Sequence, residues 1–278
     1  GVEHAVLDLL YSRFFTRALN KCGYIDLKEP FSGLVTQGMI CHETYKNADG
    51  QWLFPDEVVN KGGDKFINQL DGQDVIRGRS EKMSKSKKNV VDPEVIISDY
   101  GADTARLFML SDSPPDRDLD WTEAGVEGAW KYINKLWRMI NAPKNNLLLE
   151  MVEVPKTLNI EMLQIKQKIH QTIQSVSSDL ERFHFNKAIA RIRELTNRLD
   201  SMNTEQPNAT WIYQEGCKTI IRLLNPIIPH ITEELWKKLG HTTFLAETRW
   251  PDYDPTLLTT DNVIIGVQVN GKNRGEIE

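Results

Sequence analysis

The sequence has few cysteines, no long apolar run and no strong net charge, and each absence argues against a class of protein. The three cysteines, Cys22, Cys41 and Cys217, are far apart and never stand in Cys-x-x-Cys spacing. This argues against a disulfide framework or a structural metal, and it fits a reducing compartment. No apolar run approaches membrane-spanning length, and the N-terminus lacks the basic region of a signal peptide. We therefore expect a cytoplasmic protein with no membrane partner.

The net charge of the 278 residues is only −5, so any RNA contact has to come from local basic patches. One such patch covers residues 77–88, which hold six Lys or Arg and one Glu, a local charge of +5. Within it, small hydroxyls alternate with ammonium groups in the run Lys82-Met83-Ser84-Lys85-Ser86. Compact lysine charges, together with Ser and backbone donors, suit polyphosphate oxygens. A merely solvated surface is the alternative interpretation of a charged run.

The first 122 residues show a mixed pattern of helices and strands. Apolar spacing predicts a helix over 2–14 and a buried strand of a parallel sheet over 31–41. Residues 43–78 are polar and rich in turns, so we expect short hairpins there and not a packed unit. Asp92-Pro93-Glu94 predicts a helix N-terminus, and a second helix is expected over 103–110.

From residue 123 to residue 240 the pattern is almost wholly helical. Five apolar stripes follow one another, over 126–140, 158–180, 185–202, 212–223 and 231–239, and Gly240 closes the last. Each stripe is too narrow to be stable alone, which predicts an antiparallel helical bundle. Trp130, Trp137 and Trp236 are assigned to its core.

The two ends of the sequence indicate a piece of a longer protein. Residue 1 is Gly and not Met, and it runs straight into an apolar helical pattern. At the other end, residues 263–269, the turn Asn270-Gly271 and residues 272–278 predict a β-hairpin whose second strand stops early.

The run Lys82–Ser86, followed by Asn89 and the turn Asp92-Pro93, resembles the second signature of class I aminoacyl-tRNA synthetases. The resemblance implies an α/β plus all-α fold. Residues 1–122 would be the C-terminal half of a Rossmann-like catalytic domain that carries the mobile Lys/Ser loop. Residues 123–240 would be an antiparallel α-helical bundle that binds the anticodon region, and residues 241–278 the start of a small β-containing tRNA-binding extension.

Further segments are similar to leucyl-tRNA synthetases of the bacterial type. They are Gly1-Val2-Glu3-His4-Ala5, Gln37-Gly38-Met39, Tyr100–Phe108, Gly125–Ala129 with Trp137, Pro229–Trp236, and Val269–Lys272 with Arg274-Gly275. This likeness implies ATP-dependent activation of leucine to leucyl-adenylate and its transfer to tRNA(Leu). It implies ATP, leucine and tRNA(Leu) as partners, Mg²⁺ accompanying ATP, and a monomer.

The resemblance also implies roles for individual residues. Lys82 and Lys85 would be catalytic, because cations there stabilise the charge on departing pyrophosphate. The residues implied to contact ATP or the adenylate are Lys85, Ser84, Ser86, Gly38, Met39, Glu3 and His4. Gly38 could equally mark a packed position in a sheet. No metal ligands are expected.

Two departures from the family pattern and one absence limit these implications. Asp8 stands where the leucine enzymes usually carry a His, and Lys88 stands where Gly is common. The first class I signature, a His-x-Gly-His tetrad, occurs nowhere in the sequence, so this piece alone is expected to be inactive. The alternatives are an isoleucyl- or valyl-type synthetase of the same subclass, or a non-catalytic tRNA-binding module.

Overall fold

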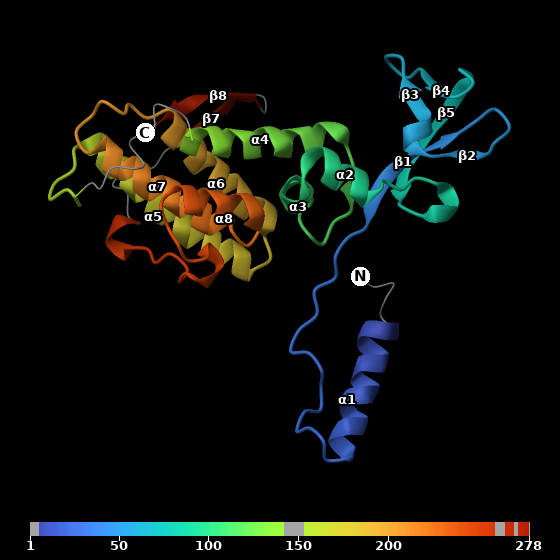
Figure 1. Ribbon diagram of the computed structural model, residues 1–278, viewed down its shortest axis with the longest axis horizontal. Coiled ribbons are helices and arrows are strands. Elements are labelled where there is room, and N and C mark those ends of the chain that lie inside the picture. The colour runs from blue at the N-terminus through green and yellow to red at the C-terminus, as the bar shows by residue number, and fades with distance from the viewer. Residues whose placement is uncertain (1–5, 142–152, 259–264, 270–271, 278) are drawn as a thin grey trace. The chain divides into compact units, whose positions relative to one another are not determined.

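The computed structural model describes residues 6–141, 153–258, 265–269 and 272–277, and it divides into two compact units (Figure 1). The first unit is Gly1–Lys131 and the second is Tyr132–Glu278. The division falls inside helix α4 (Glu123–Asn141). The predicted domain limits at residues 122 and 240 stay predictions.

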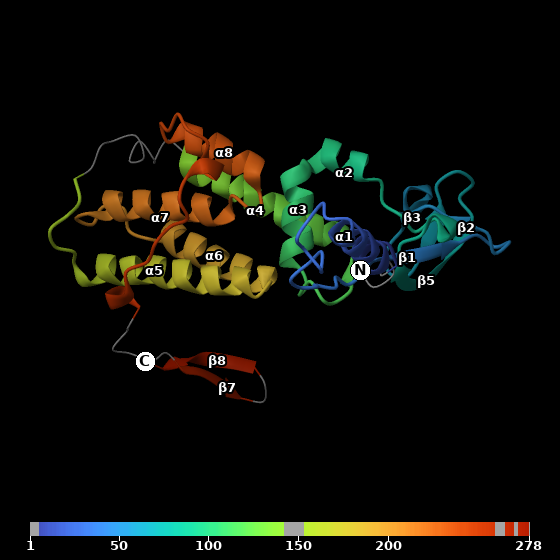
Figure 2. The same ribbon diagram turned by 90° about the horizontal axis from the view of Figure 1, so that it is seen from below.

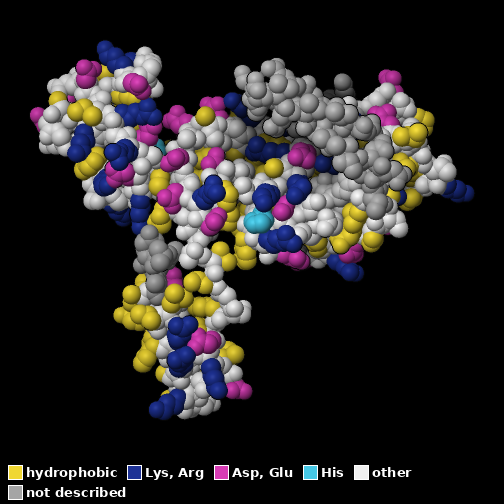
Figure 3. All heavy atoms as spheres, turned by 180° about the vertical axis from the view of Figure 1, so that it is seen from behind, with side chains coloured by type: hydrophobic (Ala, Val, Ile, Leu, Met, Phe, Trp, Pro, Cys, Tyr) yellow, Lys and Arg dark blue, Asp and Glu magenta, His cyan; other side chains and the backbone are white. Residues whose placement is uncertain are grey.

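The first unit begins with a π-helical turn, η2 (Val6–Tyr11), and helix α1 (Ser12–Lys21). The predicted helix over 2–14 is therefore confirmed from residue 6 onward, and it continues to Lys21. The chain then returns along α1, where Glu29 accepts hydrogen bonds from Arg13 at 2.7 Å and from Arg17 at 2.5 Å. Apolar side chains gather on the surface of this segment, as Figure 3 shows, and Phe14 is 66% exposed.

The strand predicted over 31–41 is wrong for most of its length. Between residues 6 and 39, which the structure describes, there is no strand, and Leu34 and Val35 are exposed. A strand of a parallel sheet needs covering layers on both faces, and the residues that the structure describes do not bury these two side chains. The parallel pairing is limited to two residue pairs, Ile40 with Leu119 and Cys41 with Asp120.

A mixed sheet forms the centre of the first unit. Its strands are β1 (Ile40–Lys46), β2 (Trp52–Leu53), β3 (Val58–Asn60), β4 (Phe66–Asn68), β5 (Asp74–Lys82) and β6 (Leu119–Asp120). They are ordered β2-β1-β5-β4-β3, and β6 pairs with β1. Apart from the β1–β6 pair, all neighbours are antiparallel, as hairpins require.

The hairpins predicted over 43–78 are confirmed, but they do form a packed unit. Tyr45, Leu53, Phe66 and Val75 make a small apolar core, each about 8% exposed or less. The sequence pattern does not predict this core, because each strand contributes only one or two apolar side chains to it and turn residues separate the strands.

Two helices follow the sheet and were both predicted. Helix α2 (Pro93–Tyr100) is capped by Asp92, whose carboxylate accepts the Glu94 N–H at 2.9 Å. Helix α3 (Ala102–Ser111) buries Leu107 and Phe108, and the Phe108 ring meets Trp121 edge to face at 5.2 Å.

The second unit is the predicted antiparallel bundle. Its helices are α5 (Ile160–Glu181), α6 (Phe185–Asp200), α7 (Ala209–Leu224) and α8 (Pro229–Lys238), joined by the C-terminal part of α4. Figure 2 shows α5, α6 and α7 side by side. The core side chains with relative exposure of 0 or 1% include Met162, Ile165, Val176, Ile189, Ile192, Leu195, Ile212, Leu223 and Leu235.

The tryptophan assignments are confirmed only in part. Trp236 is 8% exposed, whereas Trp130 and Trp137 on α4 are 42% and 38% exposed. The apolar stripe of α4 passes through its smaller neighbours Val126, Ala129 and Leu136, which are buried in their place.

The chain ends in short elements. The 3-10 turns η6 (Leu245–Glu247) and η7 (Pro255–Leu257) follow α8. The predicted hairpin is confirmed in its strands, β7 (Ile265–Val269) and β8 (Lys272–Ile277), which pair antiparallel. Its turn, Asn270-Gly271, lies outside the described residues.

Candidate active-site loop

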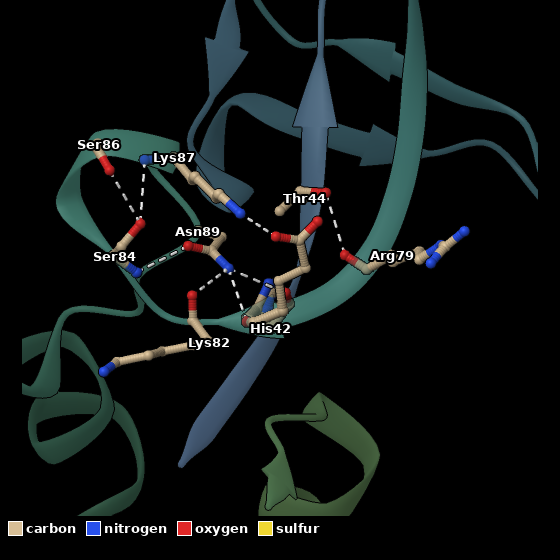
Figure 4. Close-up of polar contacts among 9 residues, drawn as sticks. His42, Thr44, Arg79, Lys82, Ser84, Ser86, Lys87 and Asn89 are labelled. Atoms are coloured by element: carbon tan, nitrogen blue, oxygen red, sulfur yellow. Dashed lines mark hydrogen bonds and ion pairs between the residues drawn. The ribbon is translucent and has the colours of Figure 1, made fainter. Parts of the chain in front are cut away.

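The Lys82–Ser86 segment forms a short loop at the end of β5 (Figure 4). The Met83 N–H still donates to Ile40 O at 3.0 Å, so pairing with β1 continues to that residue. A 3-10 turn, η4 (Lys85–Lys87), follows, and Ser84 caps it by accepting the Lys87 N–H on its hydroxyl at 3.3 Å. Ser84 Oγ also lies 3.2 Å from Ser86 Oγ. The two loop hydroxyls therefore lie next to each other.

Asn89 connects this loop to strands β1 and β5 by side-chain hydrogen bonds. Its side chain is 0% exposed, and its Oδ1 accepts the Ser84 N–H at 2.9 Å. Its Nδ2 donates toward the carbonyls of His42, Glu81 and Lys82 at 3.1, 3.0 and 3.3 Å. Lys88, at φ 56°, makes the left-handed turn that folds the chain back to Asn89.

The six cations of residues 77–88 have different surroundings. Arg77 pairs with Glu43 and, at 3.3 Å, with Asp64. Lys87 pairs with Glu81. The Lys88 ammonium lies 4.8 Å from the centre of the Phe54 ring. These three charges contribute to the fold of the unit and not to a free cationic surface.

The remaining cations point in different directions. Arg79 and Lys82 are directed to opposite sides in Figure 4, and Lys82 Nζ points away from Asn89. Lys85 is exposed in the first position of η4. Lys82 and Lys85, the two residues predicted to be catalytic, are thus both exposed, Lys82 at the end of β5 and Lys85 in the turn that follows it.

Ionisation of the neighbouring acids is coupled to these cations. The hydrogen bond from Lys87 lowers the pKa of Glu81 below its ordinary value of 4.5. Burial opposes ionisation of Glu43, but hydrogen bonds from Arg77 and Tyr45 outweigh it, and the pKa of Glu43 is also lowered. Burial, with Asp118 and Asp120 nearby, raises the pKa of the Cys41 thiol above 9.0, so Cys41 stays a neutral thiol at neutral pH.

A cavity of about 420 Å³ lies beside the loop, within the first unit. Its lining includes the predicted contacts Gly38, Met39 and Lys82, together with Met83, Met109, Leu110 and the Pro114-Pro115 pair. The structure thus brings Gly38 and Met39 next to one end of the Lys/Ser loop. The lining is largely apolar, and Lys82 is among its polar residues.

The presence of glycine at position 38 has a structural explanation that does not involve a ligand. A Cβ at this position would lie 2.0 Å from Arg117 O. The Gly38 N–H donates to Pro115 O at 2.8 Å, and the Met39 N–H donates to the Asp118 carboxylate at 2.7 Å. The close approach of two backbones therefore requires glycine here.

The structure describes only some of the other residues that the sequence singled out. Glu3 and His4 lie outside the described residues. Asp8 is exposed on η2. Asn89 and Asp118 were not predicted as site residues. Asn89 follows the Lys/Ser run closely in the sequence, but its partners are backbone groups that no residue type reveals.

Neither a metal-binding cluster nor a membrane-spanning helix is found among the described residues. Among the residues with a described placement, no group of three or more His, Cys, Asp or Glu side chains is arranged to hold a metal ion. In the same ranges, no helix is both long and apolar enough to cross a membrane.

Two family models match this chain. A model described as the anticodon-binding domain of tRNA ligase matches residues 163–278. A model described as class I tRNA synthetases (I, L, M and V) matches residues 73–122, which include the loop and helices α2 and α3.

Curated relatives match from end to end. A leucine–tRNA ligase of Paramagnetospirillum magneticum is 58% identical over 278 residues, which is 100% of this chain and 32% of the relative. A leucine–tRNA ligase of Rhodospirillum rubrum is 53% identical over 279 residues, again 100% of this chain and 32% of the relative. The chain therefore spans about a third of the length of these relatives.

A solved structure agrees with the sequence comparisons. The crystal structure of a ternary complex of Agrobacterium radiobacter K84 LeuRS with tRNA and LeuAMS has a TM-score of 0.71 and 31% identity. It covers 100% of this chain, which corresponds to 31% of that chain. Over its whole length, this chain belongs to the leucine–tRNA ligase family of class I synthetases, as a portion with the Lys/Ser loop and the anticodon-binding region.

Proposed function

We propose that this chain acts as part of a leucine–tRNA ligase, which activates leucine with ATP and transfers it to tRNA(Leu). The observation that carries the proposal is the 58% identity to such a ligase over all 278 residues. Because the chain spans about a third of that relative, the activity belongs to the whole protein and not to this portion alone.

In the proposed reaction, a leucine carboxylate oxygen attacks the α-phosphorus of ATP. The new bond gives leucyl-adenylate, and the bond to the bridging oxygen breaks, so that pyrophosphate leaves with the electron pair. The protein forms no covalent bond, and its contribution is positioning and the stabilisation of charge on the leaving group. Lys82 and Lys85 supply that charge. Both are exposed, and they are separated by only two residues of the loop.

The loop hydroxyls and the cavity residues are proposed to bind the rest of ATP. Ser84 and Ser86, with hydroxyls 3.2 Å apart, would donate to phosphate oxygens. Gly38 and Met39 line the cavity of about 420 Å³ and would lie against the adenine. Glu3 and His4 would contact the adenylate ribose or the amine of leucine, a proposal that rests on sequence resemblance alone.

Mg²⁺ is proposed to arrive with ATP. The described loop residues are cations and hydroxyls, which fit phosphate oxygens and not a magnesium ion. When bound, the ion would neutralise phosphate charge, and the roles of Lys82 and Lys85 do not depend on a metal ligand from this loop.

The bundle is proposed to contact tRNA(Leu). Supporting observations are the anticodon-binding family match over 163–278 and the presence of tRNA in the related LeuRS complex. A monomer and a cytoplasmic location belong to the same proposal and rest on sequence resemblance.

Leucine-dependent exchange of pyrophosphate into ATP by the full-length protein tests the proposal. We expect exchange with leucine at least about 100-fold faster than with valine, isoleucine or methionine, a ratio that a shaped apolar pocket achieves. Faster exchange with isoleucine or valine would assign the protein to a neighbouring branch. Binding of tRNA without exchange for any amino acid would indicate a non-catalytic tRNA-binding module.

A further inference from the structure

Through its side chain, Asn89 links the Lys/Ser loop to the sheet. It lies three positions after Ser86 and is 0% exposed, although every lysine around it reaches solvent. A buried amide without partners would be costly, so its four hydrogen-bonding groups need to be accounted for.

The amide satisfies backbone groups from three places in the chain. Its two N–H hydrogens are shared among the carbonyls of His42 on β1 and of Glu81 and Lys82 on β5. Its oxygen accepts the Ser84 N–H at 2.9 Å, on the far side of Met83. Asn89 therefore fixes the backbone immediately before and after the point at which the loop leaves the sheet (Figure 4).

We infer that Asn89 is a positioning residue for the activation step, acting through Lys82 and Lys85. The inference rests on the proposed function, because those two lysines are the groups it would position. Asn89 holds the carbonyl of Lys82 itself and the amide of Ser84, the residue before Lys85. The directions in which both lysine side chains leave the backbone are thus set by one buried amide.

Other residue types do not reproduce this set of bonds. Aspartate has the acceptor but no donors, and it would place a carboxylate against three carbonyl oxygens. Alanine would leave those carbonyls and the Ser84 N–H without the hydrogen bonds that the Asn89 amide makes. Serine keeps one hydroxyl donor and is the milder substitution, so it can be studied if the alanine variant does not fold.

The test uses pyrophosphate exchange by the full-length protein with Asn89→Ser and Asn89→Ala. We expect kcat to fall by about 100-fold, the size of effect that a misplacement of about 1 Å produces, with the KM for leucine unchanged. Asn68→Ala is the matched control, because Asn68 is also a buried asparagine of this sheet and accepts the Leu70 N–H at 2.9 Å. That variant should retain the parent kcat.

A second measurement separates positioning from stability. In a Lys82→Ala, Lys85→Ala background, Asn89→Ser should lower kcat by no more than about twofold further, since residues that act as one unit are not additive. In the unliganded protein, hydrogen exchange in Asn89→Ser should rise at the Ser84 and Lys87 amides and not in β3 or β4.

The possible outcomes are distinguishable. A parent enzyme without leucine-dependent exchange would overturn the proposed function and, with it, the catalytic role of Asn89. An active parent whose Asn89 variants match Asn68→Ala, or in which the Asn89 effect adds fully to that of the two lysines, would overturn only the positioning role.

Discussion

The Glu81 carboxylate and the Lys87 ammonium form an ion pair across the base of the Lys/Ser loop. Glu81 lies on β5 and Lys87 lies in η4, so the pair joins the two sides of the loop. Lys87 therefore differs from Lys85, two residues earlier, in having a fixed acidic partner. We therefore expect these two lysines to have different functions, which a mutational comparison can separate.

The first prediction compares these two lysines in the full-length protein. Lys85→Ala should slow pyrophosphate exchange by about 100-fold or more, because it removes a cation that is proposed to stabilise the leaving group. Lys87→Met should slow it by less than about fivefold, because Lys87 is paired with Glu81 and a solvent-exposed ion pair contributes little. Rates are measured at saturating leucine and ATP.

Lys61→Ala serves as the charge control for this comparison. It removes an exposed lysine elsewhere in the sheet unit and should leave exchange unchanged. Equal losses for Lys85→Ala and Lys87→Met would show that the loop reacts to its overall charge, and the separate roles would then be wrong.

The second prediction concerns pH and the Glu43–Arg77 pair. The pKa of Glu43 is lowered in the folded protein, so ionised Glu43 stabilises the fold above its ordinary value of 4.5, and this contribution is lost as pH falls through the lowered value. Glu43→Gln should cost about 1 kcal/mol at neutral pH, since the Glu43 side chain is only partly exposed and also accepts from Tyr45.

Calorimetric unfolding of the wild-type and Glu43→Gln proteins at neutral and acidic pH measures the effect. The gap between their melting temperatures should narrow as the pH falls below 4.5 and close below the lowered pKa of Glu43, where protonated Glu43 and Gln are both neutral. A gap that stays constant with pH would mean that the charge of Glu43 does not contribute, and that packing alone explains the loss.

The third prediction tests the close approach at Gly38. Gly38→Ala places a Cβ 2.0 Å from Arg117 O, so one of the two backbones must move. We expect a local loss of about 1–3 kcal/mol, the usual cost of forcing extra volume into a packed site. Hydrogen exchange at the Met39 and Leu119 amides, which link the two segments, reports this loss.

Gly33→Ala provides the comparison for Gly38→Ala. No atom lies within 4 Å of a Cβ built at Gly33, and its backbone is not in the left-handed region. That variant should leave exchange at Met39 and Leu119 unchanged. Unaltered exchange in Gly38→Ala as well would favour the other explanation of this glycine, which is room for a ligand.

The helices could be predicted from the sequence because their apolar residues recur every three or four positions. In α5, Met162, Ile165 and Ile169 follow this spacing, and all are buried. This spacing is enough to predict the bundle, because short connections such as residues 182–184 allow the next helix to pack only antiparallel to the previous one.

The sheet and the loop base could be predicted only in part. Apolar character alone indicated a strand over 31–41, whereas pairing with β5 and β6 begins at Ile40. The role of Asn89 depends on the carbonyl of His42, 47 positions away. Every residue has a carbonyl, so a sequence carries no signal for which one an asparagine will meet.

The last prediction tests the packing of α6 against α7. Gly216 lies in α7, where a Cβ would meet Leu199 Cδ1 at 2.4 Å, whereas nothing lies within 4 Å of a Cβ at Gly128 in α4. Both substitutions by alanine gain helix propensity of about 0.5–1 kcal/mol, so any difference between them measures crowding. Gly128→Ala should raise stability by that amount. Gly216→Ala should lower it by about 1–3 kcal/mol, because Leu199 is itself 1% exposed and has little room to move. Urea unfolding, followed by the helical circular dichroism signal, measures the stability of both variants. Equal stabilisation by both would show that α6 and α7 are packed more loosely than the Gly216–Leu199 contact requires.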